Sequence, residues 1–170
     1  MNPVKRKLLQ AWITKAKRDL LGAQQLAPNL PDLAIYHCQQ AAEKALKSVF
    51  VLHDLEPSKT HNIDTLIREV SVFHPELSAR LDEARYLSEY NQTYRYPNDP
   101  SEDLIPTPGE LKKAFSVAIN IYRDVTTILP QEVIGQRSNS SQQSNQQQPS
   151  KQQGPQQPKK QQSVDNELEL

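Results

Sequence analysis

The sequence contains a single cysteine, Cys38, and no long apolar run in its 170 residues. One cysteine excludes an internal disulfide and a cysteine-based zinc knuckle. No stretch approaches the roughly 18 apolar residues of a membrane-spanning helix, and the start of the chain lacks the apolar core of a signal peptide. The 20 basic and 20 acidic residues balance, so no global charge draws the molecule to a polyanion or a membrane. These absences predict a cytoplasmic protein.

Aromatic residues are absent after Tyr122, and the segment that follows is rich in glutamine. Between residues 135 and 162, twelve of 28 positions are Gln and none carries an apolar side chain. Such a segment cannot bury enough surface to offset the roughly 1–2 kcal/mol of backbone entropy that each ordered residue loses. We therefore predict a globular domain over residues 1–130 and a disordered tail over residues 131–170.

Apolar residues recur at helical spacing throughout the predicted domain, and no segment favours a strand. The pattern predicts five helices, over about residues 4–26, 32–53, 63–73, 75–94 and 108–129. Thr107, Pro108 and Glu110 fit a capping box at the start of the last helix. Because the connections are short, we expect an all-α, up-and-down bundle of four to five helices with largely antiparallel neighbours. Cys38 lies on the apolar stripe of the second helix, which predicts a buried, inert thiol.

Three segments carry a resemblance to a known family: AIYHCQQAAEKALKSVF (34–50), KTHNIDTLI (59–67) and YNQTYRYPND (90–99). In this order and spacing they resemble the HEPN family (higher eukaryotes and prokaryotes nucleotide-binding domains), over roughly residues 5–129. The resemblance implies a helical bundle that is usually dimeric. It also implies a ribonuclease toxin, a nucleotide-binding module, or the partner of a minimal nucleotidyltransferase.

The chain departs from the ribonuclease pattern of that family. The family's ribonucleases carry Arg, then four to six residues, then His, near the end of a late helix. Arg95 occupies this neighbourhood, but the residues after it, YPNDPSEDL, include no histidine. A formal match from Arg68 to His74 falls on the wrong element, at the end of the third predicted helix. Metal-independent ribonuclease activity is therefore the alternative, and a binding function is the main prediction.

Arg95 lies between Tyr94 and Tyr96, about one helical turn after Tyr90. A guanidinium offers bidentate donors to a phosphate, and tyrosine offers a ring on which a base can stack. The alternative is a helix end at which the arginine meets the helix dipole and the tyrosines pack on a neighbour.

Polar residues of the second predicted helix, and one just before the third, complete the predicted site, which faces a nucleotide or RNA phosphate. These are His37, Gln40, Lys44, Lys47 and His61. The alternative for the residues of the second helix is a solvated polar face, on which Glu43 and Lys47 form an i,i+4 pair. The alternative for His61 is a position without a function beside the capping residue of the third helix. The four scattered histidines lack further ligands at metal-binding spacing, so we predict no metal and no cofactor.

Together these observations predict a nucleotide- or RNA-binding module that forms a homodimer and works with a minimal nucleotidyltransferase, as in a toxin–antitoxin pair. The alternatives are a ribonuclease that uses Arg95 with His61, and a dimeric helical adaptor that binds no nucleotide.

Overall fold

The computed structural model describes residues 1–93 and 105–135, which belong to a compact unit spanning Met1–Gln136. The helices in this part are α1 (Pro3–Leu26), α2 (Pro31–Leu52), α3 (Ile63–Val70), the 3-10 helix η1 (Pro75–Arg80), α4 (Leu81–Thr93), α5 (Pro108–Ile128) and α6 (Gln131–Ile134). No strand occurs among these residues. The predicted all-α helical bundle is therefore confirmed, while residues 136–170 lie outside the described part.

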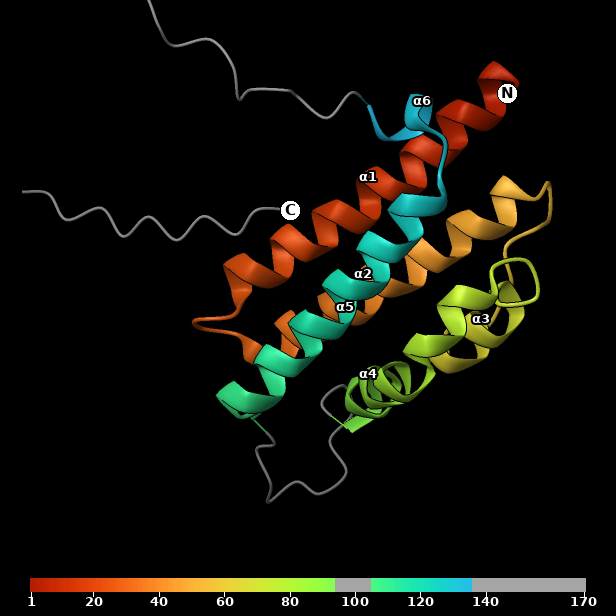
Figure 1. Ribbon diagram of the computed structural model, residues 1–170. Helices are drawn as coiled ribbons and strands as arrows, with labels where there is room; N and C mark the ends of the chain where they lie inside the picture. Colours follow the sequence, from red (N-terminus) through yellow and green to blue (C-terminus); the bar gives the residue numbers. More distant parts are fainter. Residues whose placement is uncertain (94–104, 136–170) are drawn as a thin grey trace, which may run out of the picture. The chain divides into compact units, whose positions relative to one another are not determined.

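Helix α2 occupies the centre of the bundle and packs against α1, α5, α3 and α4. In Figure 1, α1, α2 and α5 lie side by side along their lengths; the chain reverses between α1 and α2, and α5 runs in the same direction as α2. Alanines at 34, 41, 42 and 45 are fully buried along α2, so neighbouring backbones can approach it closely. A helix enclosed by neighbours buries polar positions too, and α2 buries Gln39, Glu43, Lys47 and Ser48.

Helix α1 begins where Asn2 accepts a hydrogen bond from the Val4 amide at 2.9 Å, with Pro3 at the first helical position. The buried face of α1 consists of Leu9, Ile13, Ala16, Leu20 and Ala23. These residues repeat at intervals of three and four, as the sequence predicted. Full burial of a large aliphatic side chain contributes about 2 kcal/mol, so this face fixes α1 on α2.

The third and fourth predicted helices differ from the pattern. Helix α3 begins at an Asn62 cap, whose side chain accepts from the Thr65 amide at 3.0 Å, and it ends at Val70 instead of residue 73. Proline disfavours helical geometry in the residue before it, so Pro75 holds His74 outside both helices. The predicted fourth helix is divided into η1 and α4.

Helix α5 starts with the predicted capping box. The Thr107 side chain accepts from the Glu110 amide at 3.3 Å, and the Glu110 carboxylate accepts from the Thr107 amide at 2.7 Å. The apolar pattern of the sequence predicts a face of Leu111, Phe115, Ala118, Tyr122, Val125 and Leu129. The structure buries Ala118, Val125 and Leu129 of this face, together with Ala114, Val117 and Ile121. The predicted Leu111, Phe115 and Tyr122 are only partly buried. Helix α5 packs against the alanine-rich α2.

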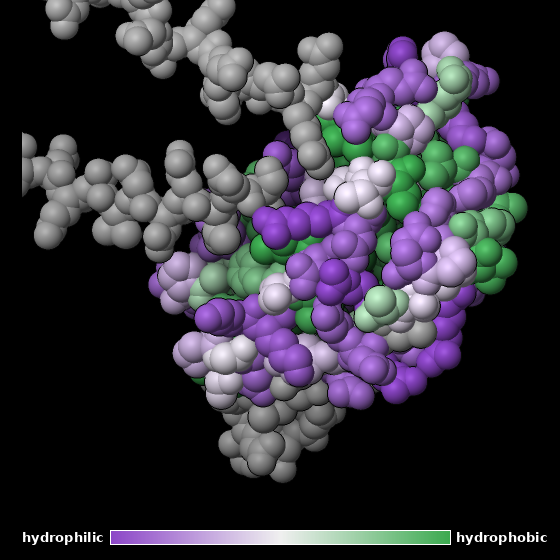
Figure 2. Space-filling view, in the orientation of Figure 1, coloured by the Kyte–Doolittle hydropathy of each residue, from purple (hydrophilic) through white to green (hydrophobic). Residues whose placement is uncertain are grey.

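Helix α6 extends the bundle beyond Pro130, where the sequence placed the end of the last helix. Val133 is only 5% exposed, and Gln10 of α1 donates a hydrogen bond to the Glu132 carbonyl at 3.0 Å. The described fold thus continues to Gly135. Figure 2 shows that hydrophilic residues cover much of one face, with hydrophobic residues between them.

Candidate functional site

A buried carboxylate, Glu43, lies at the junction of α2 with the start of α3. Its residue is only 5% exposed. It accepts hydrogen bonds from Lys47 Nζ at 2.9 Å, His61 Nδ1 at 3.0 Å and Gln39 Nε2 at 3.1 Å. Gln40 donates to Gln39 Oε1 at 2.9 Å and extends the group towards the surface. We name these five residues, Gln39, Gln40, Glu43, Lys47 and His61, the Glu43 cluster.

The charge of Glu43 is maintained by its donors. Burial alone would raise the pKa of this carboxyl, but hydrogen bonds and charge interactions with Lys47 and His61 outweigh burial and lower the pKa below its ordinary value. Glu43 is therefore ionised at neutral pH. Its fixed negative charge accepts hydrogen bonds from one lysine and one histidine.

His61 is anchored on one edge and open on the other. Nδ1 faces Glu43, and the His61 backbone carbonyl accepts from Gln39 Nε2 at 2.9 Å, yet the side chain is 78% exposed. A carboxylate can only accept, so Nδ1 carries the hydrogen and Nε2 of the neutral ring keeps a lone pair. The arrangement holds an imidazole in one tautomer and one orientation, with Nε2 on the edge away from Glu43.

The start of α3 is tied to α4, the helix that leads towards Arg95. The Ile63 amide donates to Ser88 Oγ at 3.0 Å. From Ser88 to the last described residue of α4, Thr93, the helix extends about 7.5 Å, at about 1.5 Å per residue. Tyr94, Arg95 and Tyr96 lie outside the described residues, and Tyr90 is described only as part of the helix backbone. Their participation in the site stays a prediction.

The predicted residues of α2 fall into two groups. Gln40 and Lys47 join His61 around Glu43, whereas His37 and Lys44 both pair with Asp19 of α1. His37 Nδ1 lies 3.0 Å from an Asp19 carboxylate oxygen, and Lys44 binds the other oxygen. The second group therefore ties α1 to α2.

The predicted site omitted three residues that organise these groups, Asp19, Gln39 and Glu43, because Glu43 was expected only as a surface partner of Lys47. Gln39, Glu43 and Lys47 are spaced four apart, so the alignment of their side chains was visible. The burial of this line was not, because it follows from packing against several helices. The expected solvated face is wrong for Lys47, whose side chain is only 9% exposed.

The formal arginine–histidine match from Arg68 to His74 forms no site in the described structure. Arg68 is exposed on α3, while His74 Nδ1 lies 3.1 Å from Glu76 and its Nε2 lies 3.0 Å from His53 Nε2. Within residues 1–93 and 105–135, no group of three or more histidine, cysteine or acidic residues could hold a metal ion. In the same residues, no helix is long and apolar enough to cross a membrane.

Residues 9–128 match the HEPN domain family. This chain belongs to the HEPN family. A solved structure, TT1696 from Thermus thermophilus, is 28% identical to it with a TM-score of 0.59, and the match covers 71% of this chain and 98% of TT1696. Comparison with curated proteins gave no match.

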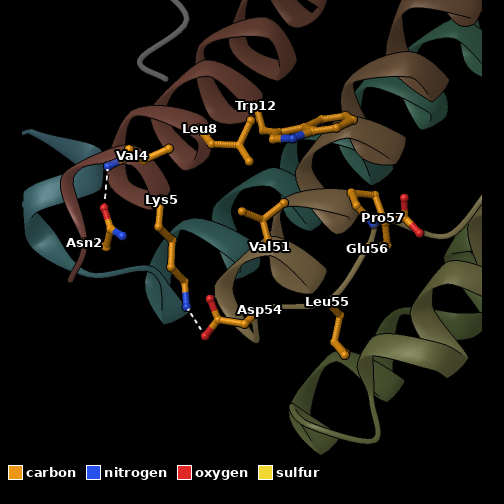
Figure 3. A pocket seen from close by; sticks show the side chains of 10 residues that line it. All are labelled: Asn2, Val4, Lys5, Leu8, Trp12, Val51, Asp54, Leu55, Glu56 and Pro57. Atoms are coloured by element: carbon orange, nitrogen blue, oxygen red, sulfur yellow. Dashed lines mark hydrogen bonds and ion pairs between the residues drawn. The ribbon is translucent and has the colours of Figure 1, made fainter.

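A groove of this HEPN domain lies between the start of α1 and the end of α2. The groove has a volume of about 580 Å³ and is lined by Asn2, Val4, Lys5, Leu8, Trp12, Val51, Asp54, Leu55, Glu56 and Pro57 (Figure 3). Lys5 Nζ and Asp54 Oδ2 lie 2.7 Å apart across it. Lys5 and Asp54 therefore form an ion pair at this groove, whose other lining residues are mostly apolar and include no residue of the Glu43 cluster.

Proposed function

We propose that this HEPN protein binds a nucleotide or an RNA phosphate at the exposed edge of the Glu43 cluster, with Arg95 as the main phosphate ligand. The observation that supports the proposal is the exposed His61 ring, held in one orientation by the buried Glu43 at 3.0 Å. A surface histidine without such an anchor would sample several rotamers. An anchored one presents Nε2 in a fixed direction, as a ligand site requires.

The charges of the site favour an anion once Arg95 is included. Glu43 and Lys47 neutralise each other at 2.9 Å, so the cluster itself is neutral when His61 is neutral and carries one positive charge when it is protonated. Arg95 follows α4, which is tied to the start of α3 through Ser88. Its guanidinium can bind two phosphate oxygens, and Tyr94 or Tyr96 can stack on a base. His61 can donate to a third phosphate oxygen when its ring is protonated, because only then does Nε2 carry a hydrogen.

Titration of the full chain with a nucleoside monophosphate and with a short single-stranded RNA tests the proposal. Arg95→Lys keeps the charge but loses the planar bidentate contact, so affinity should fall about ten- to a hundredfold, or about 1.5–3 kcal/mol. His61→Gln should weaken binding as well. The matched control is His37→Gln, which alters the histidine paired with Asp19 and should leave affinity unchanged.

Melting curves of the same variants distinguish binding from a helix-end role for Arg95. If Arg95 binds phosphate on a solvated surface, Arg95→Lys and Arg95→Ala should melt close to the unmodified chain. Unchanged affinity in both variants together with a lower melting temperature in Arg95→Ala would refute the proposal and leave Arg95 as a structural helix terminator.

The Glu43–His61 pair favours a second candidate, metal-independent RNA cleavage. A carboxylate that fixes the tautomer of a histidine also prepares that histidine to move a proton. Cleavage of RNA in the presence of a chelator, abolished by Arg95→Ala and reduced by His61→Gln, would establish this activity. Binding without cleavage would support the binding module alone.

We further propose that the protein is a cytoplasmic homodimer that works with a minimal nucleotidyltransferase, as in a toxin–antitoxin pair. Family membership supports the proposal. Light scattering at micromolar concentration should give a dimer mass, and co-expression with a short nucleotidyltransferase encoded beside its gene should yield a complex. A monomer that forms no complex would contradict the partner proposal. A dimer that binds neither nucleotide nor RNA would instead identify a helical adaptor.

A further inference from the structure

Two histidines meet between the end of α2 and the turn that follows α3. His53 is the C-terminal capping residue of α2, and His74 precedes Pro75. Their Nε2 atoms lie 3.0 Å apart, a hydrogen-bonding distance, and their ring centroids lie 5.2 Å apart. The centroid separation exceeds the nitrogen separation by about two ring radii, so the rings point at each other nearly head-on. Between two such nitrogens there is room for one hydrogen.

The surroundings fix both rings. His74 Nδ1 lies 3.1 Å from a Glu76 carboxylate oxygen, and the His53 ring stacks on Phe73 at 4.5 Å with an interplanar angle of 19°. Two neutral histidines share one hydrogen between their Nε2 atoms, and so does a pair with one added proton. With two added protons, both Nε2 atoms carry hydrogens that point at each other, and the contact becomes repulsive.

Other charged groups lie near both histidines. Lys5 of α1 and Asp54 after α2 lie on the His53 side, and Glu76 of η1 lies on the His74 side. Burial, then the charges of His74 and Lys5, lower the pKa of His53, while Asp54 opposes them. Because the folded pKa is lowered, the stability contributed by neutral His53 is present above the ordinary histidine pKa of about 6.5. This contribution is lost as the pH falls through the lower folded pKa.

We propose that His53 and His74 form a proton-operated latch that holds the α2–α3 connection, residues 53–62, against the turn between α3 and η1. The connection begins with Asp54 in a left-handed conformation, with φ of 58°, and the Leu55 amide donates to the Phe50 carbonyl at 2.9 Å. A non-glycine residue with such a φ needs surrounding contacts to hold it. At mildly acidic pH the second proton breaks the latch and loosens this connection while the helical core stays folded.

The latch concerns two surfaces at once, because the same connection carries one wall of the groove and His61. Leu55, Glu56 and Pro57 line the groove, and His61 lies near the end of the connection. Acidification would therefore loosen both surfaces through one event. The latch itself depends on neither a bound nucleotide nor the proposed function.

Amide hydrogen exchange of the full chain from about pH 7.5 to about pH 5 tests the latch, after correction for intrinsic exchange rates. Protection of the Asp54 and Leu55 amides should fall severalfold relative to amides in the middle of α2. His53→Gln should abolish this pH dependence, because glutamine stays neutral and can donate to His74. His37→Gln should retain it. Equal pH dependence in the unmodified chain and in His53→Gln would overturn the proposal.

Histidine ring resonances provide a second test that needs no variant. In the unmodified protein, the ring resonances of His74 should change as His53 takes up a proton, because the two Nε2 atoms share one hydrogen. Two independent single-step curves would also overturn the latch.

Discussion

Replacement of Glu43 by glutamine should destabilise the bundle far more than a surface carboxylate change does. The variant keeps the volume of the side chain but removes the charge that Lys47 and His61 contact at 2.9 and 3.0 Å. Lys47, whose side chain is only 9% exposed, is then left without its anionic partner. Breaking a buried pair costs about 3–5 kcal/mol. Glutamine still offers one acceptor oxygen, so we expect the free energy of unfolding to fall by about 3 kcal/mol. For a domain of this size, the melting temperature should then fall by about 10 °C.

Thermal and urea unfolding followed by circular dichroism would measure this loss. The control is Asp82→Asn, since Asp82 is 97% exposed in the side chain and lies 3.8 Å from Arg85; it should change the melting temperature little. The double variant Glu43→Gln with Lys47→Met should recover part of the loss, because no unpaired buried charge remains.

The pH dependence provides a further check on this reasoning. The pKa of Glu43 is lowered in the fold, so its contribution is present above the ordinary glutamate pKa of about 4.3 and is lost as the pH falls through the lower folded value. The difference between the unmodified chain and Glu43→Gln should therefore shrink in acid. A loss below about 1 kcal/mol at neutral pH, with no recovery in the double variant, would refute the account of Glu43 as a buried charged centre.

Three other predictions follow from the packing. Truncation after Gly135 should leave the melting temperature nearly unchanged. Truncation after Gln131 removes the buried Val133 and should lower the free energy of unfolding by about 1–2 kcal/mol. Equal melting temperatures of the two truncated chains would contradict the role of α6. Gly22→Ala should stabilise α1 by about 0.5–1 kcal/mol in urea unfolding, because the added Cβ would lie 3.8 Å from the His37 ring, an ordinary contact; destabilisation would show that the contact is too close. Cys38 should react with a thiol reagent only on unfolding, since burial raises its pKa to about 12, and rapid labelling of the native protein would contradict this.

Helix existence could be predicted from spacing, but the orientation of α5 could not. Two stripes overlap on this helix: one with Leu111, Phe115 and Tyr122, and one with Ala114, Val117 and Ile121. The sequence pattern predicted a face with these larger residues together with Ala118, Val125 and Leu129. The structure buries Ala114, Val117 and Ile121 along with Ala118 and Val125, and α5 packs against α2.

Some polar residues of α2 that surround Glu43 could be predicted from the sequence, but their geometry could not. The polar positions of α2 were visible as a flank, and the pairing of Glu43 with Lys47 follows from their spacing. The contact between Glu43 and His61 joins residues 18 positions apart, and no local rule specifies it. The same is true of His37 and Asp19, which are also 18 apart. Long-range pairs of this kind arise from the way the helices pack. Because of them, some predicted residues surround Glu43, whereas His37 and Lys44 tie α1 to α2.

The contact of α6 with the first turns of α1 brings two distant parts of the sequence together. Arg6 Nη1 lies 3.7 Å from a Glu132 carboxylate oxygen, and Gln10 donates to the Glu132 carbonyl. The described fold could therefore be circularly permuted: a short linker would join Gly135 to Asn2, which lie at the ends of neighbouring helices. The new chain ends would be placed in the turn between α1 and α2, near Asn29. Such a circular permutant would keep every helix pair while turning the α1–α6 contact from the most remote in sequence into a local one. It would also move α1 to the end of the chain, so that a ribosome would complete α2 before α1 exists to cover it.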